Sequence, residues 1–293
     1  MSGSSDILPR DQRILEWLGY GSYVDERRRI LYIETPKCGC SSIKHLLREL
    51  AGIPPFGFNP LLGETRVDMM IHDRGQFPLP TLTSFPAARL TEIVQGEGWF
   101  RFGVVRDPCE RFFSAWRDKI FLCEPGYERY RSADQRRYVE FDEFYNRVVG
   151  QEDPLACNPH WRAQTALLLP ELIRYDKLYD IGELEQLPHD LSRHLAATGQ
   201  PETVPALNKI NEGLAIRPEG FLTPDVLAGL RQFYHIDYER LDFPPSRIGW
   251  SEPRKAADLV SPFTDAIFAR NEAIAAYTSW IRQALSHTRL SAP

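Results

Sequence analysis

The stretch TPKCGCSSIKHLL, residues 35–47, places a lysine, a glycine and two serines in the corner between a predicted strand and a predicted helix. Such a corner presents the free backbone N–H groups of the helix N-terminus and the positive end of the helix dipole. Gly39 lets a ligand approach the backbone closely, and Lys37 adds a full positive charge. Ser41 and Ser42 can donate hydroxyl hydrogen bonds. These features predict an anion site, and a phosphate group suits all of them.

The order of these residues differs from the nucleoside-triphosphate loop GxxxxGK[ST], because Lys37 precedes the only glycine of the stretch. An ATP-dependent kinase would also need an apolar strand that ends in a magnesium-binding aspartate. The nearest candidate is LIRYD, residues 172–176, which Arg174 interrupts. A kinase with a degenerate phosphate loop is therefore only an alternative.

A second basic segment, VVRDPCERFFSAWRDK, spans residues 104–119. It places Arg106 at the end of an apolar run and Ser114 two helical turns further on. Both are expected at the sheet edge that carries Lys37. A guanidinium and a hydroxyl there can hold a second phosphate, since arginine binds phosphate in a bidentate manner. Two anion sites on one edge indicate a ligand with two separated phosphates.

The elements that must position these residues follow from the apolar pattern. Residues 27–35 and 99–106 are predicted strands, and residues 171–182 contain a third. A helix follows the first loop and ends near Gly52, and residues 53–85 form a long irregular connection. Further helices are expected at residues 86–95, 141–149, 183–197, 223–234 and 263–286.

The helix after the second strand has a defined start. Asp107 is a suitable N-cap, and Pro108 suits the first helical position. Asp107 and Arg111 are spaced for a local ion pair on one helical face.

Strands that alternate with helices predict an α/β fold. We expect a single three-layer domain over residues 1–293, with a central, mainly parallel sheet flanked by helices and a P-loop-like phosphate loop. Residues 1–26 are expected to be an N-terminal extension, and residues 245–293 a helical C-terminal extension.

The two basic segments together resemble the cofactor-binding signatures of sulfotransferases that use 3′-phosphoadenosine-5′-phosphosulfate (PAPS), in particular the Golgi carbohydrate sulfotransferases and their bacterial relatives. That pattern is a Pro-Lys-x-x-Cys-[ST] loop for the 5′-phosphosulfate, followed by an Arg-[DE]-Pro-x-x-Arg-x-x-Ser-[AG] segment for the 3′-phosphate. NPHW (158–161), YDIG (179–182), LNKINEG (207–213) and the helix of residues 222–243 are also similar to family segments. The resemblance covers residues 28–243, and the tail beyond Pro244 has no counterpart.

The resemblance implies transfer of the sulfuryl group of PAPS to a hydroxyl of a carbohydrate or glycoconjugate acceptor, with 3′-phosphoadenosine 5′-phosphate (PAP) as product. Lys37 would stabilise the charge that develops on the departing phosphate. The 5′-phosphosulfate would be held by Lys37, Cys38, Gly39, Cys40, Ser41 and Ser42. Arg106 and Ser114 would bind the 3′-phosphate. No metal is expected.

An acceptor hydroxyl needs a general base, and histidine is the most suitable residue at neutral pH. His72 is the first candidate, because it lies between the two motifs, about where some relatives carry a catalytic histidine. His160 in NPHW is the second, and Asp68 and Asp73 are carboxylate alternatives.

Composition limits the other possibilities. The 293 residues are 43% hydrophobic with a formal net charge of -5, which favours a globular enzyme and argues against broad nucleic-acid binding. The five cysteines lack CxxC spacing, and Cys38 and Cys40 could be only half of a zinc site. The N-terminal segment has no apolar run of signal-peptide or membrane-span length, so a cytoplasmic location is expected. A non-catalytic module that binds PAPS or PAP is a further alternative.

Overall fold

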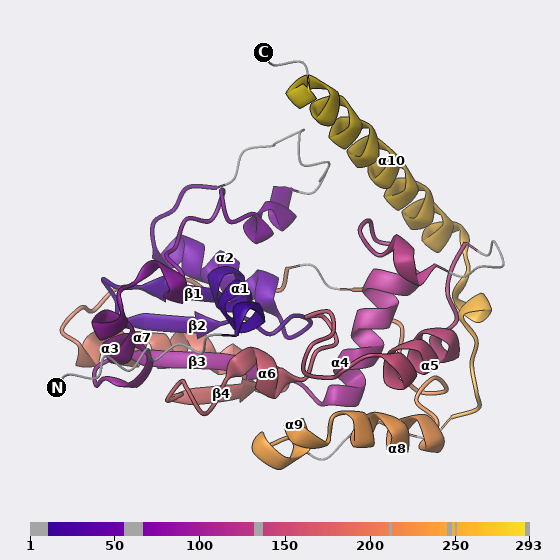
Figure 1. Cartoon of the computed structure of the whole chain (residues 1–293). Coiled ribbons are helices and arrows are strands. Elements are labelled where there is room, and N and C mark those ends of the chain that lie inside the picture. Colours follow the sequence, from indigo (N-terminus) through magenta and orange to yellow (C-terminus); the bar gives the residue numbers. More distant parts are fainter. Residues whose placement is uncertain are drawn as a thin grey trace.

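In the computed structural model, four strands form one sheet in the order β1-β2-β3-β4 (Figure 1). The strands are β1 (Ser22–Asp25), β2 (Ile30–Ile33), β3 (Phe100–Val105) and β4 (Lys177–Asp180). β2, β3 and β4 are parallel, whereas β1 is antiparallel to β2. The structure describes residues 11–55, 67–131, 137–210, 213–244, 248–249 and 251–290. The predicted α/β class with a mainly parallel sheet flanked by helices is confirmed over these residues.

Consecutive side chains of a strand point to opposite faces of the sheet, so both faces are apolar where the strand is buried. Helices cover both faces. The helices are α1 (Gln12–Gly21), α2 (Cys40–Leu50), α3 (Ala87–Gln95), α4 (Pro108–Ala115), α5 (Phe141–Gln151), α6 (Gln164–Leu168), α7 (Leu187–Ala197), α8 (Pro224–Phe233), α9 (His235–Arg240) and α10 (Pro262–Leu290). Ile30 and Tyr32 of β2 share a buried cluster with α2 and α7. Leu31 and Ile33 share the opposite cluster with α1, α3 and α6.

A third apolar cluster lies beside the sheet, where α4, α5 and α8 meet. Phe112 of α4 stacks on Phe144 of α5 with ring centroids 5.0 Å apart. The α4 helix begins as predicted, since the Asp107 carboxylate accepts hydrogen bonds from the amides of Cys109 and Glu110 and Pro108 follows it. Its continuation, Trp116–Phe121, is a π-helix. Such wide turns occur frequently at functional sites.

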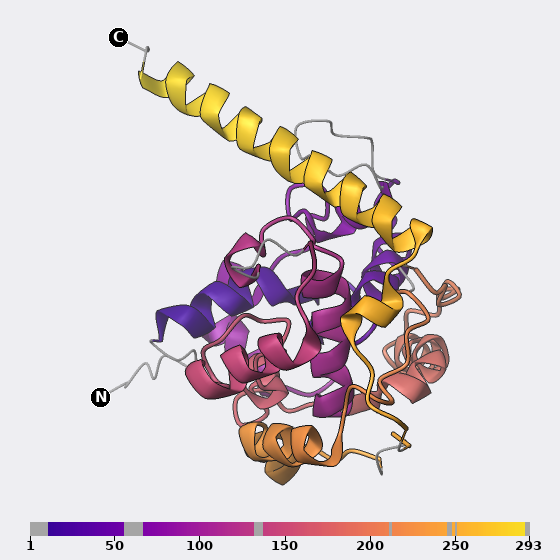
Figure 2. The same cartoon turned by 90° about the vertical axis from the view of Figure 1, so that its right-hand side faces the viewer.

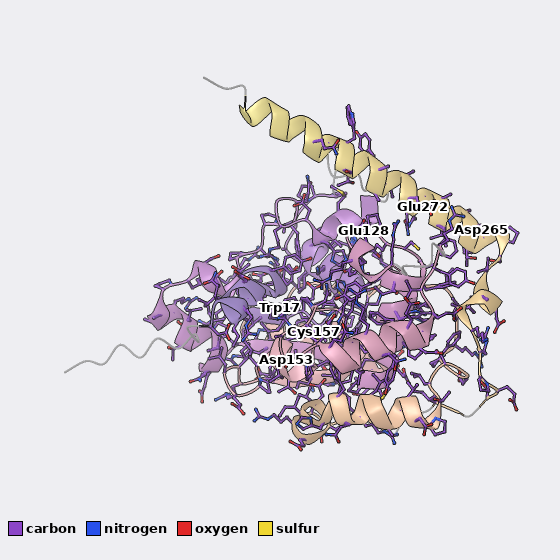
Figure 3. The ribbon with its side chains drawn as sticks, turned by 45° about the vertical axis from the view of Figure 1, so that its right-hand side comes forward. Trp17, Glu128, Asp153, Cys157, Asp265 and Glu272 are labelled. Carbon is purple, nitrogen blue, oxygen red and sulfur yellow. The ribbon has the colours of Figure 1, made fainter. Side chains whose placement is uncertain are left out.

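The two expected extensions differ in structure. Within residues 1–26, α1 and β1 pack into the layers of the sheet. At the other end, α10 extends away from the rest of the molecule (Figures 1 and 2). Its first turns are held by Arg137, which pairs with Asp265 and Glu272. Both of these acidic residues are labelled on α10 in Figure 3. None of the helices in the described part of the chain combines the length and the apolarity that a membrane span requires.

The irregular connection of residues 53–85 contains two short 3-10 helices, Val67–His72 and Leu82–Ser84. Residues 56–66 lie outside the described part, and so does the side chain of Asp68, one of the carboxylate alternatives.

Candidate active site

A cavity of about 1230 Å³ lies where the parallel strands end. The residues that directly follow β2, β3 and β4 line it, among them Glu34, Arg106 and Ile181. Ligands of open α/β sheets bind at this carboxyl edge. Most of the residues predicted from the sequence line the same cavity: Lys37, Gly39, Cys40, Ser41, Ser42, His72, Arg106, Ser114 and His160. The structure therefore brings both basic motifs and both histidines together.

The loop between β2 and α2 turns sharply at two residues with a left-handed backbone. Lys37 has φ +73° and Gly39 has φ +74°, after which α2 begins at Cys40. A side chain at position 39 would also meet Leu184, since a Cβ atom there would lie 2.9 Å from its Cδ2 atom. Left-handed backbone at a residue other than glycine is costly, and such strain is often found at ligand-binding sites.

Cys38 is the one residue of the predicted cradle that does not line the cavity. Its side chain is fully buried, and its Sγ atom lies 3.7 Å from Oε1 of Gln164. Its amide donates to the carbonyl of Thr35 at 3.2 Å. Burial raises the pKa of the Cys38 thiol to about 12, so the thiol is protonated at neutral pH. Its position indicates a packing role inside the turn.

Lys37 is paired with an acid from the second motif. Its Nζ atom forms an ion pair with Asp118, a residue of the π-helix that also lines the cavity. Burial opposes ionisation of Asp118, but Lys37 and Arg117 outweigh this effect and hold its pKa below the ordinary value. Asp118 is thus ionised, and its carboxylate neutralises the charge of the Lys37 ammonium.

Arg106 and Ser114 occupy the positions that the sequence predicts. The backbone of Arg106 is fixed by Gln164, which accepts from its amide at 3.0 Å and donates to its carbonyl at 2.8 Å. Among the described residues, the Arg106 guanidinium has one long ion pair, 3.4 Å, with Glu110. Ser114 is 2% exposed and reaches the cavity from α4. A partly exposed guanidinium and a hydroxyl on the wall of one cavity are suited to binding an anion.

The prediction of an ion pair between Asp107 and Arg111 is wrong. The Arg111 guanidinium is buried and donates to three carbonyls, those of Pro36, Pro159 and Arg162, at 2.9, 2.7 and 2.7 Å. Asp107 instead accepts from backbone amides and from the hydroxyl of Tyr238 at 3.1 Å. Three buried carbonyls outcompete one carboxylate for this side chain because they match its fork of donors. Arg111 therefore ties the loop between β2 and α2 to the segment that carries His160.

His72 belongs to a buried polar network. Its Nε2 atom lies 2.9 Å from Oγ of Ser41, and its Nδ1 atom lies 2.8 Å from Nζ of Lys44. The Lys44 ammonium lies 2.7 Å from Oε2 of Glu34. Burial and the positive charge of Lys44 lower the pKa of His72 to about 3. Burial opposes ionisation of Glu34, but Lys44 outweighs it and lowers the pKa of this carboxyl.

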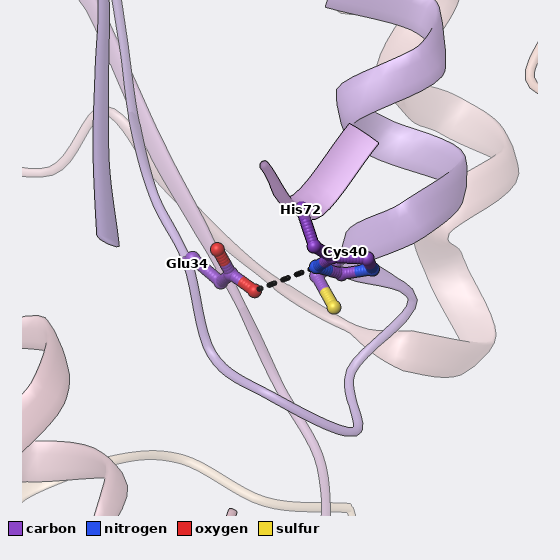
Figure 4. Close-up of side chains that lie close together, drawn as sticks. All are labelled: Glu34, Cys40 and His72. Carbon is purple, nitrogen blue, oxygen red and sulfur yellow. Dashed lines mark ion pairs between the residues drawn. The ribbon is translucent and has the colours of Figure 1, made fainter. Parts of the chain in front are cut away.

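The same network contains a set of potential metal ligands. One ligand atom each of Glu34, Cys40 and His72 lies within 4.8 Å of the others (Figure 4). The potential co-ligands of Cys40 are therefore Glu34 and His72, which the sequence did not indicate, and Cys38 is not one of them. Lys44 nevertheless binds both Glu34 and His72, so its ammonium already supplies the positive charge that a metal ion would bring to these two residues.

His160 has different surroundings. Its Nδ1 atom lies 2.9 Å from Oδ1 of Asn158 and 3.0 Å from the hydroxyl of Tyr127. Oδ1 of Asn158 also accepts the backbone amide of His160, so this atom is an acceptor and Nδ1 carries the ring proton. Burial and the charges of Lys119 and Lys37 lower the pKa of His160 below its ordinary value. His160 is therefore neutral, with an unprotonated Nε2 atom.

Two further parts of the wall come from different regions. Ile210 donates its amide to Oγ of Ser42 at 2.9 Å, which places this residue beside the start of α2. The helix α1 adds Trp17 and Tyr20, which the sequence reasoning missed. The available signal was an N-cap at Asp11 followed by apolar residues at helical spacing, among them Ile14 and Trp17.

A comparison with protein families matches the model described as "Sulfotransferase family" to residues 20–244. Among curated proteins, carbohydrate sulfotransferase 14 of Danio rerio is 30% identical over 195 residues, which are 62% of this chain and 49% of that protein. Carbohydrate sulfotransferase 9 of Homo sapiens is 29% identical over 195 residues, covering 61% of this chain and 41% of that protein.

A longer alignment is found with carbohydrate sulfotransferase 10 of Xenopus laevis, which is 28% identical over 259 residues and covers 79% of this chain and 67% of that protein. The chain thus spans about half the length of the first two relatives. No solved structure matches it.

Proposed function

The chain belongs to the sulfotransferase family, and we propose that it transfers the sulfuryl group of PAPS to a hydroxyl of a carbohydrate or glycoconjugate. The observation that carries this proposal is the location of Lys37 and Arg106 on the wall of one cavity. Each cation comes from a different motif, and each follows a parallel strand. This arrangement suits a ligand with phosphates at both ends, which adenosine bisphosphates have and ATP lacks.

We assign the cofactor roles as follows. The P-loop-like turn of residues 35–41 supports the 5′-phosphosulfate with the N-terminus of α2, Lys37 and the two serines. Lys37 stabilises the negative charge that grows on the 5′-phosphate as its bond to sulfur breaks. Arg106 and Ser114 bind the 3′-phosphate. The pairing of Lys37 with Asp118 supports this role, since this ammonium already binds an oxyanion.

In the reaction, the bond between sulfur and the 5′-phosphate oxygen breaks while a bond forms from sulfur to the acceptor oxygen. The acceptor proton passes to a general base, and PAP leaves. We assign the base to His160, because its Nε2 atom is unprotonated and accepts no hydrogen bond from the described residues. His72 is less suitable, because Lys44 occupies its Nδ1 atom.

Labelled PAPS incubated with candidate glycans tests the proposal. Labelled product supports it, whereas tight binding of PAP without turnover of any acceptor would favour the non-catalytic module. We expect Lys37→Met to lower kcat by about 100-fold and His160→Ala to lower it by about 100-fold or more, with PAP affinity nearly unchanged in the latter. Tighter binding of ATP than of PAP would favour the kinase alternative.

A further inference from the structure

Lys44 is a fully buried lysine next to the phosphate loop, on the first turns of α2. Its side chain is 0% exposed, although burial of an ammonium is costly unless the charge is compensated. Glu34 compensates it at 2.7 Å, and the rings of Tyr23 and Tyr20 lie 5.2 and 5.8 Å from the Nζ atom. No step of the proposed reaction uses this residue.

The hydrogen bonds of Lys44 determine the tautomer of His72. An ammonium has only donors, so the Nδ1 atom 2.8 Å away must accept. The ring proton of neutral His72 is then on Nε2, which donates to Oγ of Ser41 at 2.9 Å. This is the opposite tautomer from that of His160. The two histidines of the cavity are thus chemically different.

The tautomer in turn orients the Ser41 hydroxyl. Because Oγ accepts a hydrogen bond from His72, its own proton points elsewhere. Ser41 lines the cavity and lies in the first turn of α2, where the proposed 5′-phosphosulfate would bind. A hydroxyl that donates is needed there, since a hydroxyl that offered its lone pair would repel an anion.

We propose that Lys44 is a positioning residue that fixes His72 as an Nε2–H donor and thereby fixes the Ser41 hydroxyl as a donor to the 5′-phosphate. This inference rests on the proposed function for the identity of the anion. It assigns His72 a donor role in cofactor binding and leaves proton abstraction to His160. Successive contacts join Glu34, Lys44, His72 and Ser41. Through them the buried Lys44 ammonium determines the direction of the Ser41 hydrogen bond, although the ammonium itself does not contact Ser41.

The first test measures the tautomer in the protein without ligand. Nitrogen-15 NMR of the imidazole rings distinguishes a protonated Nε2 atom from a protonated Nδ1 atom. We expect Nε2–H for His72 in the wild type and a loss of this preference in Lys44→Met. A wild-type His72 protonated at Nδ1 would overturn the proposal, even if PAP bound tightly. Failure of the wild type to bind PAP would instead count against the proposed function.

The second test is a double-mutant cycle with PAP binding measured by calorimetry. We expect Ser41→Ala and Lys44→Met each to lower PAP affinity about tenfold, and the double variant to lose no more than Ser41→Ala. Additive losses would show that Lys44 does not act through Ser41 and would overturn the proposal. Lys177→Met is the matched control, since Lys177 lies on β4 outside the cavity lining, and it should leave PAP affinity unchanged.

Replacement of His72 covers the case in which Lys44→Met does not fold. The amide nitrogen of Gln can take the position of Nε2 and donate to Ser41, whereas the shorter side chain of Asn cannot reach it. His72→Gln should therefore keep more PAP affinity than His72→Asn. Equal losses in these two variants would contradict the donor role of His72.

Discussion

The ammonium of Lys37 is paired with the carboxylate of Asp118, a residue 81 positions later in the chain. Asp118 belongs to the π-helix Trp116–Phe121 and lines the cavity. Its sequence neighbours Arg117 and Lys119 line the cavity as well. Asp118 therefore competes with any anion that binds Lys37. A phosphate that enters this site must displace Asp118 or share the Lys37 ammonium with it.

Asp118→Asn should strengthen PAP binding about three- to tenfold at pH 7, because it removes the competing anion from Lys37. Burial lowers the pKa of Lys37, and the carboxylate of Asp118 opposes this effect. The variant should therefore lose its advantage as the pH rises, since Lys37 loses its proton earlier than in the wild type. Calorimetry at several pH values checks both effects, and weaker binding of PAP at every pH would contradict the competition.

Arg106→Ala should lower PAP affinity about 10- to 100-fold while adenosine 5′-monophosphate, which lacks the 3′-phosphate, binds almost as before. The reason is that Arg106 is assigned to the 3′-phosphate alone. Glu110→Gln is the control, because it removes the carboxylate 3.4 Å from the guanidinium and should leave PAP affinity equal or higher. Equal losses for both nucleotides would remove Arg106 from the 3′-phosphate site.

The sequence predicted Lys37 and Arg106 because each lies in a loop that follows an apolar strand, and the edge at which parallel strands end is fixed by topology. Lys37 and Arg106 line the cavity for this reason, and Ser114 reaches it from α4. The Lys44–His72 contact was not predictable, since residues 53–85 show no periodicity that would place His72 against α2.

The error for Arg111 has a different cause. Sequence spacing compares only residues on the same helix, whereas its three carbonyl partners come from two distant segments. Backbone carbonyls are present at every position and so leave no mark in the sequence. The helix α1 was missed because its polar residues concealed a short amphipathic pattern.

Stability should depend on pH through His72. Burial lowers its pKa to about 3, from an ordinary value near 6.5 in the unfolded chain. Between these values the unfolded chain binds the extra proton, so the free energy of unfolding falls as the pH falls from about 6.5 toward 3. His160 acts in the same direction, since its pKa is also lowered.

In His72→Gln the free energy of unfolding should change less steeply with pH, by an amount that corresponds to close to one bound proton. Urea unfolding between about pH 4.5 and 6.5 measures this slope, and the range lies above that in which most carboxylates titrate. His235→Gln, which removes an exposed histidine whose Nδ1 atom lies 3.1 Å from the carbonyl of Gln232, is the control variant. An unchanged slope in His72→Gln would show that His72 is protonated in the folded protein.

Arg111→Lys should destabilise the protein by about 2–4 kcal/mol, although it conserves the charge. Lysine can reach one of the carbonyls of Pro36, Pro159 and Arg162, and the others would remain buried without a donor. Urea unfolding measures the loss, and Arg193→Lys, at a side chain that is 70% exposed, is the control with an expected change below about 0.5 kcal/mol. PAP affinity should also fall in Arg111→Lys, because Pro36 positions Lys37. A folded variant of unchanged stability would show that these carbonyls find other donors and that Arg111 does not hold the loop.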